Sequence, residues 1–233
     1  MKNILITRAK RQIEKTINSE EGIFSKDKNV FIRDQTEFLK IITFGSNLVF
    51  VGSEEMITWC KERFANQRPE TVLEDSNREM LNLKLSEYNK KLSSVSTRYL
   101  QLKTNIMYKP IGYVFKFYKN EEILLIKDAK INKLYQKNQS TYVLLAYKES
   151  HLVGYAKADL DVGELWSLSV DVNQTYKTQG VGRYLVAKLT EIVRKEGRLQ
   201  YYLTNAFNLG STRLALSCGY LPVWVACSAI EFE

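Results

Sequence analysis

The sequence of 233 residues contains one histidine, His151, and three cysteines, Cys60, Cys218 and Cys227. The cysteines are odd in number, show no CxxC spacing and stand among apolar residues, so they favour buried thiols over disulfides or zinc ligands. His151 ends the polar segment KESH, and a histidine-based metal site or a Ser-His-Asp triad would have to be built around it alone. We therefore expect no metal and no histidine-dependent nucleophile.

Long hydrophobic runs are also missing. No apolar stretch approaches the roughly 18 residues that are needed to cross a bilayer. The first residues, MKNILITRAKRQIEK, lack the apolar region and the small-residue cleavage site of a signal peptide. With 45% apolar and 26% charged residues, the composition is that of a folded protein. We expect a cytoplasmic protein with no membrane partner.

The chain has no long basic run, although its net charge is +8. The excess of lysine and arginine lies mainly in the first half of the chain. The longest basic cluster is RAKR, and no aromatic-plus-glycine RNA-binding signature is present. Nucleic-acid binding would rest on net charge alone, and solvated lysines that aid solubility explain that charge better. We do not expect a nucleic-acid partner.

The first half of the chain shows mixed α/β patterning without a recognisable chemical motif. Apolar residues at three- and four-residue spacing predict helices over residues 54–64 and 77–95, and NLVFVG predicts a strand over residues 47–52. The pattern changes near residues 104–118, and no repeat or low-complexity linker marks the change. We therefore expect an N-terminal α/β region over residues 1–110 and a second domain over residues 111–233.

The second half has a more regular order of elements. In chain order the predicted elements are a helix over 120–136, strands over 142–148, 152–158 and 164–170, a helix over 180–197, a strand over 199–204, a helix over 210–219, and strands over 220–226 and 228–233. The glycines that close the last two helices are typical C-terminal signals. This order indicates a layered α/β domain.

One segment of the second domain suggests chemistry. In DVNQTYKTQGVGRYL, residues 171–185, Gly180 and Gly182 stand at the head of an amphipathic helix. Helix N-termini carry unpaired N–H groups and bind anions, and glycines let a phosphate approach the backbone, although many such pairs are only tight turns. The GK[ST] ending of a P-loop is missing, and Leu185 occupies the third position of GxGxxG. Neither nucleotide motif fits.

The wider segment ELWSLSVDVNQTYKTQGVGRYLVAKL resembles motif A of the GNAT superfamily of acetyl-CoA-dependent N-acyltransferases. In that family a strand ending in valine is followed by [RQ]-x-x-G-x-[GA] and a helix. Val170 ends the strand here, and Lys177, Gly180 and Gly182 occupy the motif positions. Lysine keeps the charge of the usual arginine but loses its planar fork.

A second match lies downstream. NLGSTRLALSCGY resembles the family's N-x-x-A-x-x-L-Y-x-x-x-G-[FY] segment, with Asn208, Ser211, Leu214, Gly219 and Tyr220 in register. The resemblance covers roughly residues 110–233. The chain also looks like a bacterial subgroup of two-part GNAT proteins that carry an N-terminal α/β region.

This resemblance implies a GNAT fold, with a central mixed, splayed β-sheet flanked by helices, beside a smaller N-terminal α/β region. It implies an N-acetyltransferase that moves an acetyl group from acetyl-CoA directly to a primary amine of an unidentified acceptor, with no metal. The alternative is a catalytically weak or inactive GNAT-like protein that binds CoA and serves interaction or regulation. A homodimer is compatible with either.

The resemblance also implies a donor site. Its cofactor-binding residues are Leu168, Ser169, Val170, Lys177, Thr178, Gln179, Gly180, Val181, Gly182, Arg183, Asn208 and Ser211. The backbone of Leu168 and Val170 would bind pantetheine as an added strand, and the N–H near Leu168 would stabilise the oxyanion. The amides of residues 177–182 would bind the pyrophosphate, and Asn208 would lie near the acyl sulfur or the pantetheine arm.

The catalytic groups are less well marked. Glu164, six residues before Val170, stands where several members hold a catalytic glutamate, and is our first candidate for the base. Asp159 and Asp161 fit a preceding turn better than a catalytic role. Ala215 replaces the family's usual tyrosine proton donor. The CoA thiolate that departs after acetyl transfer would take its proton from Ser217, Cys218, Tyr220, Tyr202 or water, or would leave unassisted.

Overall fold

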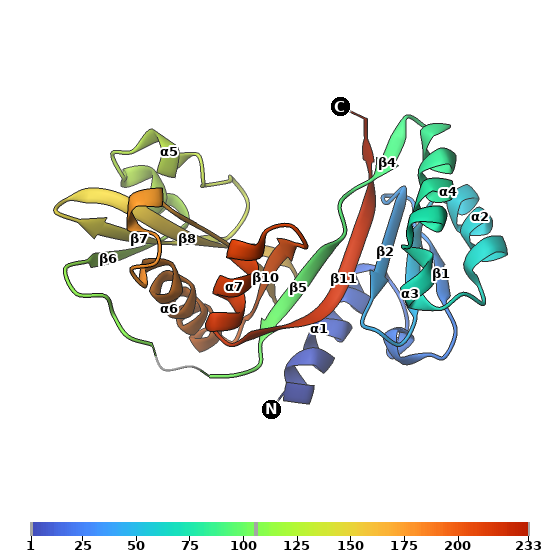
Figure 1. Cartoon of the computed structure of the whole chain (residues 1–233), viewed down its shortest axis with the longest axis horizontal. Helices are drawn as coiled ribbons and strands as arrows, with labels where there is room; N and C mark the ends of the chain where they lie inside the picture. The colour runs from blue at the N-terminus through green and yellow to red at the C-terminus, as the bar shows by residue number, and fades with distance from the viewer. Residues whose placement is uncertain (1, 105–106, 233) are drawn as a thin grey trace. The chain divides into compact units, whose positions relative to one another are not determined.

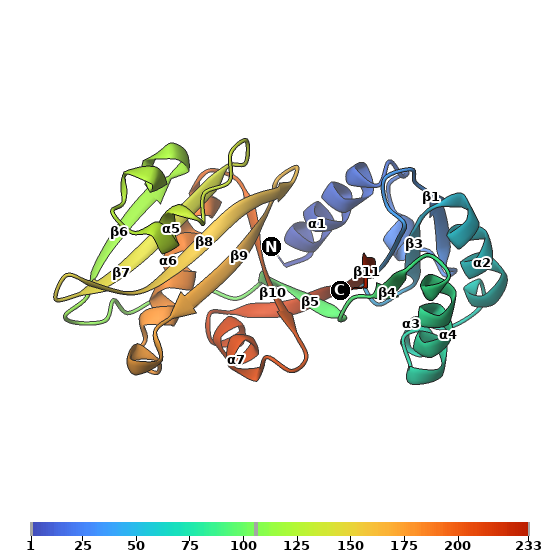
Figure 2. The ribbon, with the colours of Figure 1, turned by 90° about the horizontal axis from the view of Figure 1, so that it is seen from above.

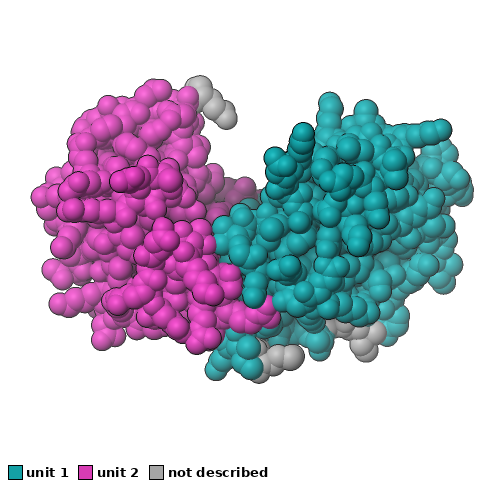
Figure 3. Space-filling view, turned by 180° about the vertical axis from the view of Figure 1, so that it is seen from behind, with its two compact units in different colours: residues 1–5, 99–203, 208–221 teal, residues 6–98, 204–207, 222–233 magenta. Residues whose placement is uncertain are grey.

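The computed structural model describes residues 2–104 and 107–232. The chain forms two compact units (Figures 1 and 3). Unit 1 comprises Met1–Leu5, Tyr99–Leu203 and Asn208–Leu221, and unit 2 comprises Ile6–Arg98, Thr204–Phe207 and Pro222–Glu233. The main segment of unit 1 begins at Tyr99, and the C-terminal strand β11 (Tyr220–Glu231) starts in unit 1 and continues into unit 2. The division into residues 1–110 and 111–233 stays a prediction.

Unit 2 contains a small mixed sheet. Its strands are β1 (Val30–Arg33), β3 (Leu48–Gly52), β2 (Leu39–Thr43), the second part of β11, and β4 (Lys90–Leu92), in this spatial order. The β1–β3 pair is parallel, and the other pairs are antiparallel. The predicted strand over residues 47–52 is confirmed as β3.

The helices of unit 2 follow from apolar spacing. The unit contains most of α1 (Lys2–Thr16), η1 (Ile23–Ser25), α2 (Glu54–Phe64), α3 (Pro69–Val72) and α4 (Asp75–Ser86). The prediction for residues 54–64 is confirmed, since α2 buries Met56, Cys60 and Phe64 at four-residue spacing. The helix predicted over residues 77–95 is too long. It ends at Ser86, and left-handed Asn89 turns the chain into β4.

Unit 1 is built on a sheet with the strand order β6 (Val114–Lys119), β7 (Thr141–Lys148), β8 (His151–Val162), β9 (Leu165–Val172) and β10 (Leu199–Asn205). β9 and β10 are parallel, and the other neighbours are antiparallel. The predicted β7–β8 hairpin is confirmed, with Glu149 and Ser150 both left-handed in its two-residue turn. β5 (Ser96–Gln101) enters this unit at Tyr99.

Both faces of this sheet are covered (Figures 1 and 2). On one face, Leu144 and Ala156 pack with the apolar side of α6 (Val181–Lys195). On the other face, Val143 and Leu145 pack with the short helical segments that follow β6. Since successive strand residues point to opposite faces, β7 reads as a continuous apolar run.

Two predicted elements of the second half are wrong in detail. The helix expected over residues 120–136 is split into η2 (Asn120–Leu125) and α5 (Ala129–Asn132), because Ile126 is extended and Asp128 caps a new helix at Lys130 N. The two C-terminal strands are one, β11. The helices over 180–197 and 210–219 are confirmed as α6 and α7 (Leu209–Ser217), each followed by a left-handed glycine.

The three cysteines are free and buried, as expected. Burial raises the pKa of the Cys60 thiol to about 12 and that of the Cys218 thiol to about 11. Among the described residues, no helix is long and apolar enough to span a membrane.

Candidate functional site: a strand gap and a glycine loop

The parallel strands β9 and β10 separate halfway along their length. Their register runs from Leu165 opposite Leu199 to Leu168 opposite Tyr202, where the pairing stops. β9 continues to Val172, still paired with β8, and β10 continues to Asn205. Ser169 and Val170 thus follow the last β9–β10 pair. This is the splayed sheet that the sequence resemblance implies.

The loop after β9 places a helix N-terminus beside this gap. Asn173 caps the turn η3 (Gln174–Tyr176) by accepting a hydrogen bond from Thr175 N at 3.3 Å. Thr178 and Gly180 then adopt left-handed conformations, with φ of 67° and 82°. α6 begins at Val181.

The first turn of α6 presents backbone donors. The first helical hydrogen bond runs from Tyr184 N to Gly180 O at 3.0 Å, so the amides of Val181, Gly182 and Arg183 have no acceptor within the helix. Together with the helix dipole, these amides favour an anion at this end. The Lys177 and Arg183 side chains are exposed and add positive charge on either side of the loop.

The two motif glycines meet different constraints. Gly180 needs its left-handed backbone, and a Cβ atom there would meet only Pro110 Cγ, at 3.8 Å. Gly182 has helical geometry, and its Cβ atom would make ordinary 3.5 Å contacts with side chains of Val172 and Leu214. Loop conformation therefore favours glycine at position 180 but not at position 182.

Asn208 and Ser211 belong to a hydrogen-bonded group at the last β9–β10 pair. The Asn208 side chain caps α7 by accepting from Ser211 N at 3.1 Å. The Ser211 hydroxyl shares a 2.8 Å hydrogen bond with the hydroxyl of Tyr202, the β10 residue that closes the pairing. Burial raises the pKa of Tyr202, so its hydroxyl stays protonated at neutral pH.

The other proton-donor candidates have different environments. Tyr220 is fully buried, with its hydroxyl 2.7 Å from Thr190 Oγ1 and 3.3 Å from Gln200 Oε1, and burial raises its pKa. Ser217 Oγ donates to Leu214 O within α7 at 2.8 Å. These positions disfavour Tyr220 and Ser217 as donors to a bound thiolate.

Glu164 lies in the turn before β9, where the β9–β10 pairing begins. Its carbonyl oxygen accepts from Leu199 N at 2.9 Å, and its side chain is half-buried. Leu168 lies four positions further along the chain, about 13 Å away at the usual rise of a strand. A direct contact between the Glu164 carboxylate and a group bound beyond Leu168 would have to cover that distance.

Asp159 and Asp161 lie in β8 and not in the turn we expected. Asp159 contacts Lys157 Nζ and accepts from Thr141 Oγ1, each at 2.8 Å, and Asp161 accepts from the Tyr201 hydroxyl at 2.8 Å. Both carboxylates hold the sheet together. No cluster of three or more metal-ligating side chains occurs within residues 2–104 and 107–232.

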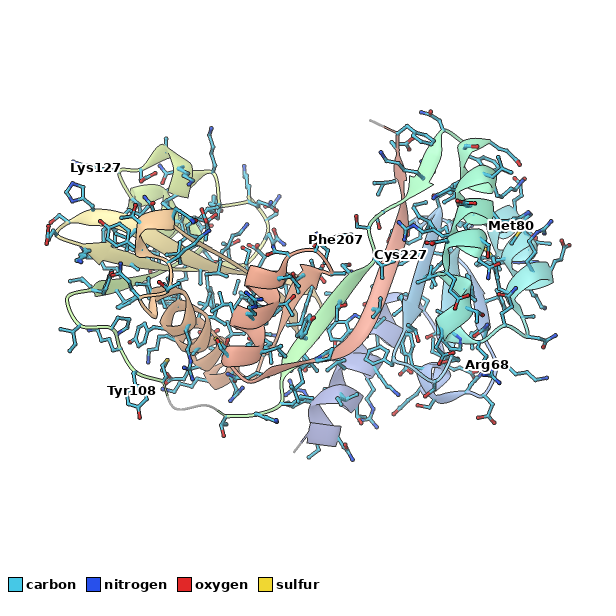
Figure 4. All side chains as sticks on the ribbon, viewed as in Figure 1. Arg68, Met80, Tyr108, Lys127, Phe207 and Cys227 are labelled. Carbon is cyan, nitrogen blue, oxygen red and sulfur yellow. The ribbon has the colours of Figure 1, made fainter. Side chains whose placement is uncertain are left out.

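The segment before β6 also lies against residues 177–180, which we call the glycine loop. No sequence signal indicated this contact. Met107 and Tyr108 line a pocket of about 120 Å³ together with Gly180, Arg183 and Cys218. Tyr108, labelled in Figure 4, is mostly exposed beside it. Further along the same segment, Tyr113 hydrogen-bonds to the loop residue Gln179.

Comparison with known proteins finds one family model and several similar solved structures. The model of the "Acetyltransferase (GNAT) family" matches residues 105–220. A putative GNAT acetyltransferase structure from Novosphingobium aromaticivorans is similar at 12% identity and a TM-score of 0.45, covering 62% of this chain and 68% of that one. A GNAT acetyltransferase from Colwellia psychrerythraea has 12% identity, a TM-score of 0.47 and coverages of 70% and 75%. No curated protein matches.

Proposed function

We propose that this chain, which belongs to the acetyltransferase (GNAT) family through residues 105–220, transfers an acetyl group from acetyl-CoA to a primary amine. The observation that carries the proposal is the end of the β9–β10 pairing at Leu168 and Tyr202, with the left-handed Gly180 at the start of α6 twelve residues after Leu168. A strand gap and an anion-binding helix terminus on one continuous segment suit a ligand with both an amide-bearing arm and a pyrophosphate.

The donor fits this segment in two parts. Beyond Leu168, the backbone of Ser169 and Val170 has β8 on one side and can pair with the amides of pantetheine on the other. The Lys177 amide already donates to Gln174 O at 3.3 Å, so the amides of Thr178 through Arg183 would receive the pyrophosphate, with the exposed Lys177 and Arg183 cations nearby. Asn208 would lie close to the pantetheine arm, since its cap partner Ser211 contacts Tyr202 at the gap.

Transfer also requires a neutral amine. An alkyl amine has a pKa of about 10 and is mostly protonated at pH 7, so a base must remove a proton. Glu164 remains our candidate, and its position at the start of β9 means that it would act through water. A backbone N–H of β9 near Leu168 would stabilise the oxyanion that forms as the amine attacks the thioester carbon.

The departing thiolate then needs a proton. We assign this role to the Ser211 hydroxyl, backed by Tyr202, in place of the tyrosine that Ala215 replaces. Ser211 is half-buried at the N-terminus of α7, and Tyr202 is buried and protonated behind it. A proton passing from Ser211 to the sulfur would be replaced from the Tyr202 hydroxyl, 2.8 Å away, and the tyrosinate left behind would take a proton from solvent before the next turnover.

Titration calorimetry with acetyl-CoA, combined with an amine screen that detects free thiol, tests the function. We expect binding of acetyl-CoA and thiol release with at least one amine, and no binding at hundreds of micromolar would refute the proposal. Binding without turnover on any amine would favour the alternative, a CoA-binding regulatory protein.

With an accepted amine, Glu164→Gln should lower kcat without changing the calorimetric affinity, and an unchanged kcat would exclude Glu164 as base.

Ser211→Ala should lower kcat on the order of 100-fold, because general-acid groups contribute factors of that size. Affinity for acetyl-CoA should change little, and the loss should shrink with donors whose thiol is more acidic, since these need no proton. Ser217→Ala is the matched control: Ser217 lies on the same helix but donates to Leu214 O. Equal losses in the two variants would contradict the role of Ser211.

A further inference from the structure

The glycine loop is tied to the segment that precedes β6. The Tyr113 hydroxyl donates to Gln179 Oε1 at 2.5 Å, and Gln179 Nε2 donates to Thr175 O at 3.1 Å. The side-chain amide of Gln179 therefore uses both of its ends. It connects Tyr113 to the turn at Thr175, directly before the left-handed residues of the loop.

Tyr113 is itself firmly held. Only 7% of it is exposed. Its ring meets the Tyr176 ring edge to face at a centroid distance of 6.4 Å, and Lys148 Nζ lies 5.6 Å from the Tyr113 centroid and 5.8 Å from that of Tyr176. Phe115, two residues along the chain, packs against Tyr184 in the first turn of α6, with their ring centroids 4.3 Å apart. These aromatic contacts hold Tyr113 between the turn before the loop and the first turn of α6.

The exposed part of the loop has little else to fix its shape. The residues from Lys177 to Gly180 are exposed, so they gain no stability from apolar burial. Thr178 is left-handed although it is not glycine, a conformation that persists only where the surroundings support it. The hydrogen bond from Tyr113 joins Gln179, the residue between the two left-handed positions, to the buried part of unit 1.

We propose that Tyr113 is a positioning residue for the donor's pyrophosphate. By holding Gln179, it keeps the loop amides oriented before the anion arrives, which lowers the cost of ordering the loop on binding. The inference rests on the proposed function, and it concerns only the nucleotide end of the donor. The pantetheine arm binds along β9, which Tyr113 does not contact through this hydrogen bond.

The test compares Tyr113→Phe with the wild-type protein on two donors, acetyl-CoA and S-acetylpantetheine, which lacks the pyrophosphate. The substitution keeps the ring and removes one neutral hydrogen bond, so we expect affinity for acetyl-CoA to fall about fivefold. Affinity for S-acetylpantetheine, followed by ligand-observed NMR, should stay at the wild-type value. Tyr135→Phe, which removes an exposed hydroxyl contact to Glu121, should change neither affinity.

A double-mutant cycle adds a second readout. Gln179→Ala should weaken acetyl-CoA binding, and adding Tyr113→Phe to it should weaken binding no further, because the two side chains act through one hydrogen bond. Unchanged acetyl-CoA affinity in Tyr113→Phe, or an equal loss on both donors, would overturn the inference. If the wild-type protein itself did not bind acetyl-CoA, the proposed function would fail instead, so the two failures are distinct.

Discussion

Gly219→Ala should lower the free energy of unfolding by about 3 kcal/mol or more, the combined effect of a left-handed alanine and a backbone overlap. Gly219 has a φ of 82°, and a Cβ atom there would lie 2.1 Å from the carbonyl oxygen of Lys103. The two segments cannot simply move apart, since the amides of Leu102 and Lys103 both donate to Gly219 O at 3.1 Å. Urea denaturation measures the loss.

Gly197→Ala separates these two causes. Gly197 has a similar φ of 75°, but a Cβ atom there would meet nothing within 4 Å. We expect a loss of only about 1 kcal/mol, the cost of the left-handed backbone. Equal losses in Gly197→Ala and Gly219→Ala would show that the contact with Lys103 contributes nothing.

Gly180→Val should weaken acetyl-CoA binding by about 100-fold, because a β-branched residue opposes the left-handed backbone that aims the loop amides. The same change should leave the protein folded, since a Cβ atom there would make only an ordinary 3.8 Å contact with Pro110 Cγ. Calorimetry gives the affinity, and circular dichroism reports on the fold.

Gly197→Val is the matched control for this variant. Gly197 follows the other end of α6 and is also left-handed in open space, so valine costs similar stability there. Acetyl-CoA affinity should stay near the wild-type value, because this end of the helix presents carbonyl oxygens and not amides. If both valine variants bound acetyl-CoA equally weakly, general destabilisation would explain the loss, and the loop would not be the pyrophosphate site.

Much of unit 1 could be predicted from the sequence because its signals are local. The β7–β8 hairpin, α6 and its closing Gly197 were each specified by residues within a few positions of one another. The same holds for the loop around Gly180, where backbone freedom and a helix start occur together. Such features depend on periodicity and on allowed φ values, which adjacent residues set by themselves.

Local signals failed where a distant contact decided the outcome. The segment over residues 120–136 has helical spacing, yet it forms two short helical segments whose apolar residues Ile123 and Ile131 pack on β7. Tyr220 is one of several proton-donor candidates in the sequence, and its hydroxyl is buried against Thr190. Ser211 and Tyr202 are nine residues apart, and their hydrogen bond depends on how β10 and α7 meet.

By itself, the sequence determined the glycine loop, the helix behind it and the family to which they belong. Only the tertiary structure decided where β9 and β10 separate, which hydroxyl stands at that point, and that Tyr113 holds Gln179 from 66 residues away. The physical reason is range: backbone preferences act between neighbouring residues, whereas a buried polar group finds its partner only after the sheet has brought distant segments together.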